Sequence, residues 1–443
     1  MRTLRFLTGW FAAGLLLAGT APLSAEVWTA AQAVDTALSH SPDAALARAR
    51  VEAAEALITQ ARAAWYPQLS LSGRYTETNS PMMAFGSILN QRAFNFGLDF
   101  NHPGRIDNLN VTGTVAYNLY SGGRASAGRT AAEAGTRAAE QDLRAAQHQL
   151  AAEAVKALLN LRKAREAVGA VEAGVRAYEA AVANARLRFA AGQMLKADLL
   201  SLEVQLAQTR ETLTLTRHGA ALAAQAFQFV LGLEPVPAES IELAPEDPAL
   251  AALTAPEGGD FSARPELAGV HERVRAAEAM VAAARGARRP TVNAFASYQY
   301  DQGWQLDRHA DSWLAGLSVD VNVFDGGQTT GKIRQAAAEL AQAKEMLRKV
   351  QLGLALEVQQ ARLAHASARE RLAVSAQVVA QAEESAALSR ARFEKGALLT
   401  ADLIGVESRL LEARMRRTVA EADERIALTE LRRALGLPPL GQP

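Results

Sequence analysis

Two copies of one short motif decide the fold of this chain: RFAAGQMLKADL at residues 188–199 and RFEKGALLTADL at residues 392–403. In each copy a glycine follows Arg-Phe by three residues, and Asp-Leu comes after five more. The same offset of 204 residues relates two further motif pairs, Gly122-Gly123 with Gly326-Gly327 and Leu231-Gly232 with Leu435-Gly436. An offset that stays constant over so long a stretch indicates a tandem duplication.

The duplication divides the chain into two structural repeats, of which the first contains an insertion. Pro42 pairs with Pro265 and Pro67 with Pro290 at an offset of 223, which is 19 more than 204. The extra 19 residues therefore fall between Pro67 and Gly122, where we expect a surface loop. The expected organisation is a first repeat at 26–232, an irregular, proline-rich equatorial connector at 233–262, a second repeat at 263–436 and a C-terminal tail at 437–443.

A long proline-free stretch before each tip motif has the periodicity of a coiled-coil helix. Apolar residues recur every seven positions at Leu161, Val168, Val175, Val182 and Phe189, and again at Leu372, Val379, Ala386 and Phe393. Such a repeat is typical of helices packed in left-handed supercoils. At 1.5 Å per residue the predicted helix is roughly 100 Å long. The glycine of the tip motif then marks a turn into a returning helix.

Four segments alternate apolar and polar residues, as strands do. They are 68–77 and 108–120 in the first repeat and 291–300 and 312–324 in the second. Each has about ten residues, the length that a tilted strand needs to cross a bilayer. Aromatic residues near the strand ends are candidates for interfacial girdles: Trp65, Tyr66, Tyr117, Tyr120, Tyr298, Tyr300 and Trp313.

The loop expected between the first two strands, roughly residues 78–107, is unusually apolar. It contains Met82, Met83, Phe85, Phe96 and Phe100, among other apolar residues. Because a flexible surface loop should be more polar, we expect it to cover something. A pore mouth, lipid and a neighbouring protomer all stay open as its contact.

Residues 1–25 have the pattern of a secretory signal peptide. Arg2 and Arg5 precede an apolar run, and small residues lead to an expected cleavage after Ala25. No other stretch approaches the 18 consecutive apolar residues of a membrane helix. We therefore expect an exported protein without a helical anchor.

Composition argues against several classes of function. The chain has 47 basic and 47 acidic residues, whereas a nucleic-acid-binding protein should show a basic excess. It contains no cysteine, which rules out disulfides and thiolate metal sites. Its seven histidines show no metal-ligand spacing, and neither a nucleophile motif nor a phosphate loop is present. We expect no enzyme, no cofactor and no nucleic-acid partner.

The strands and helices together predict an unusual architecture. Four strands are too few to close a barrel, and an open sheet edge is not tolerated in lipid. Transmembrane strands would therefore have to be pooled by several chains. The long helices begin directly after the strands, at Gly122 and Gly326, so they must project from one side of the membrane as a long tube.

These features resemble the TolC-type outer-membrane efflux and secretion channels, the outer membrane factors, over essentially the whole chain after residue 25. The resemblance implies a mixed α+β membrane protein that forms a homotrimer. Its four strands per chain would make a 12-stranded barrel in the lipid of the outer membrane, continued by an α-helical coiled-coil tunnel through the periplasm of a Gram-negative-type cell. It would be a passive conduit of a tripartite efflux pump or type I secretion system, working with an inner-membrane transporter and a periplasmic adaptor (membrane fusion) protein. Since there is no cysteine to carry a lipid anchor, the chain is similar to the non-lipidated members.

The resemblance also assigns roles to the tip motifs. Candidates for the pore entrance or gate are Asp198, Asp402, Phe393 and Leu398. Candidates for adaptor docking are Gly192, Gln193, Met194, Leu199, Gly396, Ala397 and Leu403. Leu398 and Gly405 stand where some members carry a gating arginine and a second aspartate, so the familiar polar lock is not expected here.

The residues alone leave several roles open. Asp198 and Asp402 are equally well accounted for as first-turn carboxylates that the helix dipole favours, and the two tip glycines as helix ends. The strands would also suit soluble hairpins of an exported coiled-coil scaffold, an interaction protein without a pore. An exported enzyme has no cluster of polar residues to support it.

Overall fold

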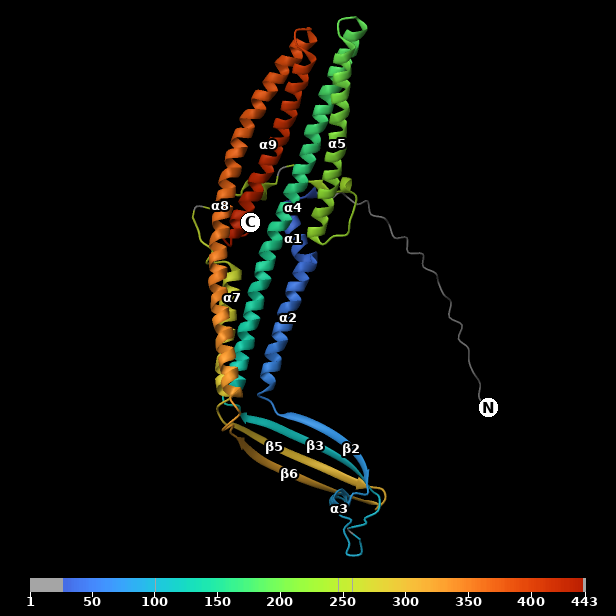
Figure 1. The fold of residues 1–443 in the computed structure, drawn as a ribbon, viewed down its shortest axis with the longest axis vertical. Coiled ribbons are helices and arrows are strands. Elements are labelled where there is room, and N and C mark those ends of the chain that lie inside the picture. The colour runs from blue at the N-terminus through green and yellow to red at the C-terminus, as the bar shows by residue number, and fades with distance from the viewer. Residues whose placement is uncertain (1–26, 100, 246, 257, 441–443) are drawn as a thin grey trace, which may run out of the picture.

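The computed structural model describes residues 27–99, 101–245, 247–256 and 258–440. The expected signal peptide, Phe100 of the apolar loop and the last three residues of the expected tail lie outside the described residues. The protomer is an elongated rod, with two helical hairpin tips at one end and a four-stranded sheet at the other (Figure 1).

Two matching helical hairpins run along the rod. The first consists of α4 (Arg124–Ala190) and α5 (Lys196–Leu231), and the second of α8 (Gln328–Glu394) and α9 (Thr400–Ala434). α4 and α8 have 67 residues each, which makes them roughly 100 Å long, as the heptad pattern predicts. Within the described ranges, no helix has both the length and the apolarity that a membrane span requires.

A shorter helix accompanies each long one in the half of the rod nearer the sheet. α2 (Pro42–Ala63) packs on α4, and α7 (Pro265–Gly286) packs between α4 and α8. Both begin at a proline, which suits the first helical position because its N–H would have no partner there. Both have 22 residues and start 223 residues apart. The offset read from the sequence therefore holds for the helix bounds.

The sheet joins the two repeats edge to edge. Its antiparallel strands follow the order β2 (Gln68–Thr78), β3 (Ile106–Tyr120), β5 (Thr291–Gly303) and β6 (Arg308–Asp320). β6 begins and ends four residues before the predicted segment 312–324. The reason is a tight turn, with Asp307 at a φ of 49°, that reverses the chain directly after β5. β2 and β6 are the two edges.

Alternation gives the sheet one apolar and one polar face. Residues directly opposite each other on antiparallel strands point to the same face. Val111 lies opposite Tyr300 on the apolar face, whereas Asn110 lies opposite Asp301 on the polar face. The pattern predicted for a strand between lipid and a polar interior is therefore present in the folded sheet.

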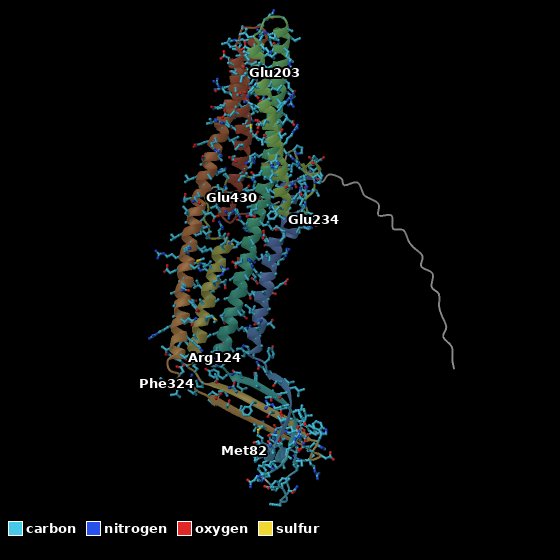
Figure 2. All side chains as sticks on the ribbon, turned by 45° about the vertical axis from the view of Figure 1, so that its right-hand side comes forward. Met82, Arg124, Glu203, Glu234, Phe324 and Glu430 are labelled. Carbon is cyan, nitrogen blue, oxygen red and sulfur yellow. The ribbon has the colours of Figure 1, made fainter. Side chains whose placement is uncertain are left out.

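The apolar loop folds back over the polar face through α3 (Pro81–Asn90). The Nε2 group of Gln91 donates to the Asp107 carbonyl (2.7 Å) and to Asn108 Oδ1 (2.9 Å). Asn108 in turn donates to Asp301 Oδ1 on the same face (2.6 Å). α3 thus lies at the end of the sheet away from the helices, where Met82 projects (Figure 2).

The remaining elements pack against the hairpins at mid-length of the rod and form a small apolar core there. α1 (Ala30–His40) packs on α4 and α5, and its largest core partners are Leu158, Leu161 and Phe227. The connector is not wholly irregular, because it contains a short 3₁₀ turn (Ala238–Ser240), β4 (Glu242–Leu243), which pairs with β1 (Val27–Trp28), and α6 (Pro248–Ala251). Trp28 meets Phe227 edge to face at 5.5 Å between ring centroids.

Charged side chains form a cluster beside this core, and one ion pair of the cluster joins the two repeats. Lys156 of α4 contacts Glu430 of α9, which also accepts a 2.8 Å hydrogen bond from Arg433. Arg433 and Arg264 both contact Glu357 of α8, and the Arg264–Glu357 distance is 3.1 Å. Glu430 lies at mid-length of the rod (Figure 2). Burial alone would raise the pKa of Glu430, but hydrogen bonds from Lys156 and Arg433 outweigh it and hold that pKa below its ordinary value.

Acid should weaken the protomer through Glu430. Because its folded-state pKa lies below its unfolded-state value of about 4.3, its stabilising contribution is complete at neutral pH. That contribution is lost as the pH falls through the folded-state pKa. Glu430→Gln should lower stability at neutral pH and reduce its loss in acid, as thermal unfolding at a series of pH values would measure. Glu412→Gln, which changes a more exposed carboxylate paired with Arg416, is the control. The same acid response in Glu430→Gln as in the unmutated protein would exclude this role.

Candidate functional site at the hairpin tips

Both hairpins turn through the same backbone motif. At the first tip Gln193 N–H donates to Arg188 O (2.8 Å), and at the second Ala397 N–H donates to Arg392 O (2.8 Å). Gly192 and Gly396 have φ values of 70° and 73°. This is the Schellman helix end, in which glycine avoids the cost of a left-handed conformation. The glycines of the tip motif therefore have a structural role whatever else they do.

One apolar core lies beneath both tips. Phe393 and Leu403 of the second hairpin are each 2% exposed, and they pack with Val182, Leu199 and Leu202 of the first. Leu398 and Met194 pack against this core from its edge. The two tips are consequently one packed unit within the protomer.

Arg188 connects the tips directly. Its Nη1 donates to the Phe393 carbonyl at 2.9 Å, and its guanidinium carbon lies 5.4 Å from the centre of the Phe393 ring. A cation above an aromatic face is attracted by the ring quadrupole. The matching Arg392 of the second tip is exposed and has no such partner among the described residues.

Tyr178 makes a second connection farther from the tips. Its hydroxyl donates to the Ile404 carbonyl (3.2 Å) and lies 2.9 Å from Ser408 Oγ. Burial raises the pKa of Tyr178, so the side chain stays neutral. Tyr178 lies three residues after Val175 of the heptad stripe, and the stripe did not indicate this polar contact.

Ion pairs also hold the two helices of each hairpin together, in duplicate. They are Arg186–Glu203 (2.7 Å) and Arg210–Glu179 (2.8 Å) in the first hairpin, and Arg390–Glu407 (2.7 Å) and Arg414–Glu383 (2.7 Å) in the second. Each residue of an ion pair in the second hairpin lies 204 positions after its counterpart in the first. Their hydrogen-bonded geometry was not predicted, although equal charges at equal offsets were a visible signal.

The candidates for the pore entrance lie in different environments. Asp198 is half-buried and Asp402 exposed, each in the first turn of the returning helix, and Leu398 is half-buried. Phe393 is buried and lies under Arg188, so its ring packs inside the protomer. Its role at the pore entrance stays a prediction.

The candidates for docking divide in the same way. Gly192, Gln193, Gly396 and Ala397 are exposed at the tips, and Met194 is half-buried. Leu199 and Leu403 face the core, at 9% and 2% exposure, because they follow the aspartates onto the inner side of the returning helices. The role of these candidates in adaptor docking stays a prediction.

The aromatic candidates collect at the two ends of the sheet. Trp65, Tyr66, Tyr117 and Tyr120 lie at the end that joins the helices. Tyr298 and Tyr300 lie toward the other end, with Trp313 directly opposite Tyr298 on the apolar face. Trp65, Tyr66, Tyr298 and Trp313 are at least half exposed on the protomer.

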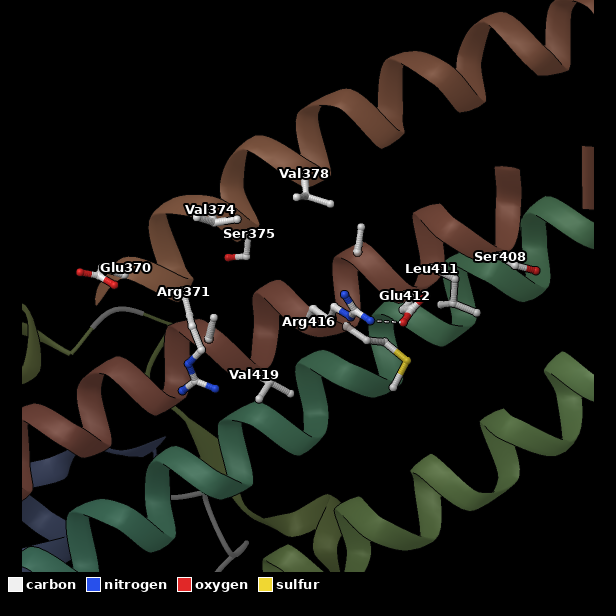
Figure 3. Close-up of a pocket in the computed structure, with 13 residues that line it drawn as sticks. Glu370, Arg371, Val374, Ser375, Val378, Ser408, Leu411, Glu412, Arg416 and Val419 are labelled. Atoms are coloured by element: carbon white, nitrogen blue, oxygen red, sulfur yellow. Dashed lines mark hydrogen bonds and ion pairs between the residues drawn. The ribbon is translucent and has the colours of Figure 1, made fainter. Parts of the chain in front are cut away.

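An apolar groove runs between α8 and α9 below the second tip. Its volume is about 850 Å³, and its lining includes Val374, Val378, Leu411 and Val419 (Figure 3). The charged residues at its rim include Arg416, which pairs with Glu412 of its own helix at 2.5 Å. Its other polar lining residues include Glu370, Arg371, Ser375 and Ser408.

The chain matches one protein family over most of its length. The family described as outer membrane efflux protein matches residues 33–233 and 262–437. Protein CyaE of Bordetella pertussis is 26% identical over 413 residues, which cover 91% of this chain and 83% of that relative. Outer membrane efflux protein BepC of Brucella suis is 24% identical over 340 residues, which cover 74% and 72%.

Solved structures have the same fold. The outer-membrane channel OprN superposes with a TM-score of 0.76 at 22% identity and covers 92% of this chain and 89% of its own. The outer membrane protein VceC of Vibrio cholerae gives 0.76 at 21% identity, with 92% and 96% covered. The Campylobacter jejuni CmeC outer membrane channel gives 0.77 at 15% identity, with 92% and 85% covered.

Removing Arg188 should separate the two tips. Arg188→Leu deletes the hydrogen bond to the Phe393 carbonyl and the contact with its ring, which together contribute about 1–3 kcal/mol. Spin labels on cysteines at the exposed positions Ala191 and Lys395 would report a longer and broader distance between the tips. Arg186→Leu, which breaks an ion pair inside one hairpin, should leave that distance unchanged. If both variants gave the distance of the unmutated protein, Arg188 would not connect the tips.

Proposed function

Because the chain belongs to the family of outer membrane efflux proteins, we propose that it is the outer-membrane channel of a tripartite efflux pump or type I secretion system. It acts as a passive conduit from the periplasm to the exterior. An inner-membrane transporter supplies the energy, and a periplasmic adaptor protein joins the two. The relatives CyaE and BepC, aligned over most of the chain, support the efflux or secretion role.

The observation that carries this proposal is a sheet with two unpaired edges, joined to helical hairpins about 100 Å long. Lipid does not satisfy the N–H and C=O groups of an edge strand. Three protomers with four strands each close a barrel of twelve strands, and their twelve helices continue it as a tunnel. A pore-free scaffold would have no need for an apolar face on a sheet whose edges are open.

The two faces of the sheet then have separate environments. The apolar face, with its aromatic residues at both ends, contacts lipid and its interfaces. The polar face lines the channel, with Asn110, Asp301 and their neighbours. α3 lies on this polar face and therefore narrows the outer mouth, where Met82, Met83 and Phe96 are 87%, 58% and 97% exposed.

The tips form the periplasmic end of the channel. Asp198 and Asp402 from three chains set six carboxylates near the entrance, which favours cations. Phe393 and the half-buried Leu398 are the apolar candidates for a constriction. The exposed residues of the two turns, Gly192, Gln193, Gly396 and Ala397, with Met194, are the docking surface for the adaptor.

Cation preference is the direct test of the channel and its entrance. The double substitution of Asp198→Ala and Asp402→Ala removes the proposed ring of charge, so the reversal potential in a salt gradient across a planar bilayer should move toward zero. Glu384→Gln, which neutralises an exposed carboxylate elsewhere on α8, is the control. Unchanged selectivity in the double variant would remove these aspartates from the entrance. An absence of channels with the unmutated protein would contradict the proposed function itself.

Shortening the apolar loop should widen the outer mouth. Replacing residues 81–99 by a short Gly-Ser linker removes α3 from the polar face, and β5 and β6 show that four residues are enough to connect two strands of this sheet. Single-channel conductance should rise while the oligomer persists. Met82→Ser, which leaves α3 in place, should change conductance much less. Equal conductance after the deletion would mean that α3 does not obstruct the channel.

A further inference from the structure

The two repeats contact each other within the protomer, and the duplicated copy of each contact surface lies uncovered on the outside of the protomer. α4 of the first repeat packs against α7 and α9 of the second. By the duplication, α8 corresponds to α4, while α2 and α5 correspond to α7 and α9. In the described part of the protomer α8 packs mainly on α7 and α9 of its own repeat. α8 also has large apolar side chains that are exposed in the protomer, namely Leu352, Leu356 and Leu363, together with Val378 of the groove described above.

We propose that α8 of one protomer packs against α2 and α5 of the next, in the register that α4 adopts against α7 and α9. The proposal rests on the trimeric channel inferred above and specifies which residues meet between its subunits. Positions of α4 and β3 correspond to positions of α8 and β6 that are 204 residues later, and positions of α9 to positions of α5 that are 204 residues earlier. Positions of α7 and β5 correspond to positions of α2 and β2 that are 223 residues earlier. We call this contact the subunit seam and the contact within the protomer the repeat seam.

Where the repeat seam has an ion pair, the corresponding positions of the subunit seam mostly have two neutral residues. Four ion pairs of the described residues cross the repeat seam, and three of them are Lys156–Glu430, Lys163–Asp423 and Arg137–Glu272. Their counterparts are neutral on both sides: Gln360 with Ala226, Ser367 with Gly219, and Ala341 with Ala49. All six are exposed in the isolated protomer. An unpaired charge in a covered interface is strongly destabilising, so simultaneous loss of both charges fits positions that face each other.

A fourth ion pair is only partly lost. Arg273–Asp142 of the repeat seam becomes Arg50 with Met346. Both counterparts are exposed in the protomer. An arginine can cover an apolar neighbour with its methylene stem while its charged end stays in water, so this pair is compatible with the seam.

Side-chain sizes are exchanged across the two seams. At the repeat seam Gly174 lies against Leu411, whose Cδ2 would be 3.2 Å from a Cβ at position 174. The counterparts are the larger Val378 and the smaller Ala207. Likewise Tyr178 with Ser408 becomes Ala382 with Val204. At each seam a large side chain faces a small one, but the helix that carries the large side chain differs between the two seams. Close packing between facing positions requires such a match of sizes.

The tip contact should recur between subunits. Arg188 covers Phe393 within the protomer, and its counterparts are Arg392 and Phe189 of the next subunit. Phe189 is 41% exposed, whereas Phe393 is 2% exposed. We therefore expect the exposed Arg392 of one subunit to cover the exposed ring of Phe189 in the next, as Arg188 covers Phe393 within the protomer.

The sheet gives an independent register for the same seam. Val115 of β3 lies opposite Ala296 of β5, which maps to Val319 of β6 opposite Gly73 of β2 in the next subunit. Adjacent residues then place Leu317 opposite Tyr75 and Ser318 opposite Arg74. Apolar residues meet on one face and polar residues on the other, as a correct register requires.

Disulfide formation tests the helix register, since the full chain has no cysteine of its own. A disulfide needs Cα atoms within about 7 Å of each other. The variant with Val378→Cys and Ala207→Cys should give covalent dimers and trimers on oxidation. Val378→Cys with His218→Cys is the matched control, because position 218 lies eleven residues, or roughly 16 Å, along the same helix. It should stay monomeric on a denaturing gel.

The sheet provides a second pair with its own control. Ser318→Cys with Arg74→Cys should crosslink neighbouring subunits, whereas Ser318→Cys with Ser72→Cys, displaced by about 7 Å, should not. Native mass of the same samples separates the two proposals. A trimer that crosslinks only in the control combinations would overturn the register while the channel stands. A protein that is monomeric in detergent would overturn the proposed channel and the seam with it.

Introduced charge gives a measure independent of crosslinking. Ala49→Glu alone should weaken the trimer, because it buries a carboxylate without a partner. Adding Ala341→Arg rebuilds the counterpart of the Arg137–Glu272 pair, which is 2.8 Å long, and should restore the trimer fraction at a given concentration of denaturing detergent. Equal fractions in the single and double variants would mean that these positions do not face each other.

Discussion

Unpaired backbone groups along β2 and β6 are the constraint on which the rest of the molecule depends. A sheet of this kind, apolar on one face and open at two edges, is stable in lipid only when each edge meets another strand. The duplication supplies the means, because the contact that joins β3 to β5 within the chain can be repeated between chains. The long hairpins leave the strands at Gly122 and Gly326, and in the proposed trimer they run parallel to one another around a closed ring.

Much of this fold was predictable because both repeats carry the same sequence pattern. The offsets of 204 and 223 reproduce the starts of α8 and α7, and the heptad stripe predicted the length of α4. The end of β6 was missed because alternation continues past Asp320, whereas strand pairing stops where the β5–β6 turn dictates. Local pattern indicates a strand, but the partner strand sets its limits.

The candidate site was predictable in position and only partly in detail. The motif located both turns and both first-turn aspartates, because helix ends depend on nearby residues. The heptad stripes contain both Phe189 and Phe393, but they did not reveal that only Phe393 is buried in the protomer, since a heptad stripe does not specify which hairpin lies opposite. The position of α3 on the polar face was likewise invisible, because it depends on Gln91 reaching strand residues 16 and 17 positions later.

The exchange of large and small side chains between α4 and α8 also bears on misassembly. If α8 of one chain displaced α4 from the α9 of another, Val378 would meet Leu411, and two large side chains would compete for the space that Gly174 leaves free. The displaced α4 would then set Gly174 against Ala207 and leave a void. Both errors are costly in a close-packed interface. In the proposed trimer, side-chain volume therefore favours the alternation of repeats around the ring, and chains that meet in the wrong order pack poorly.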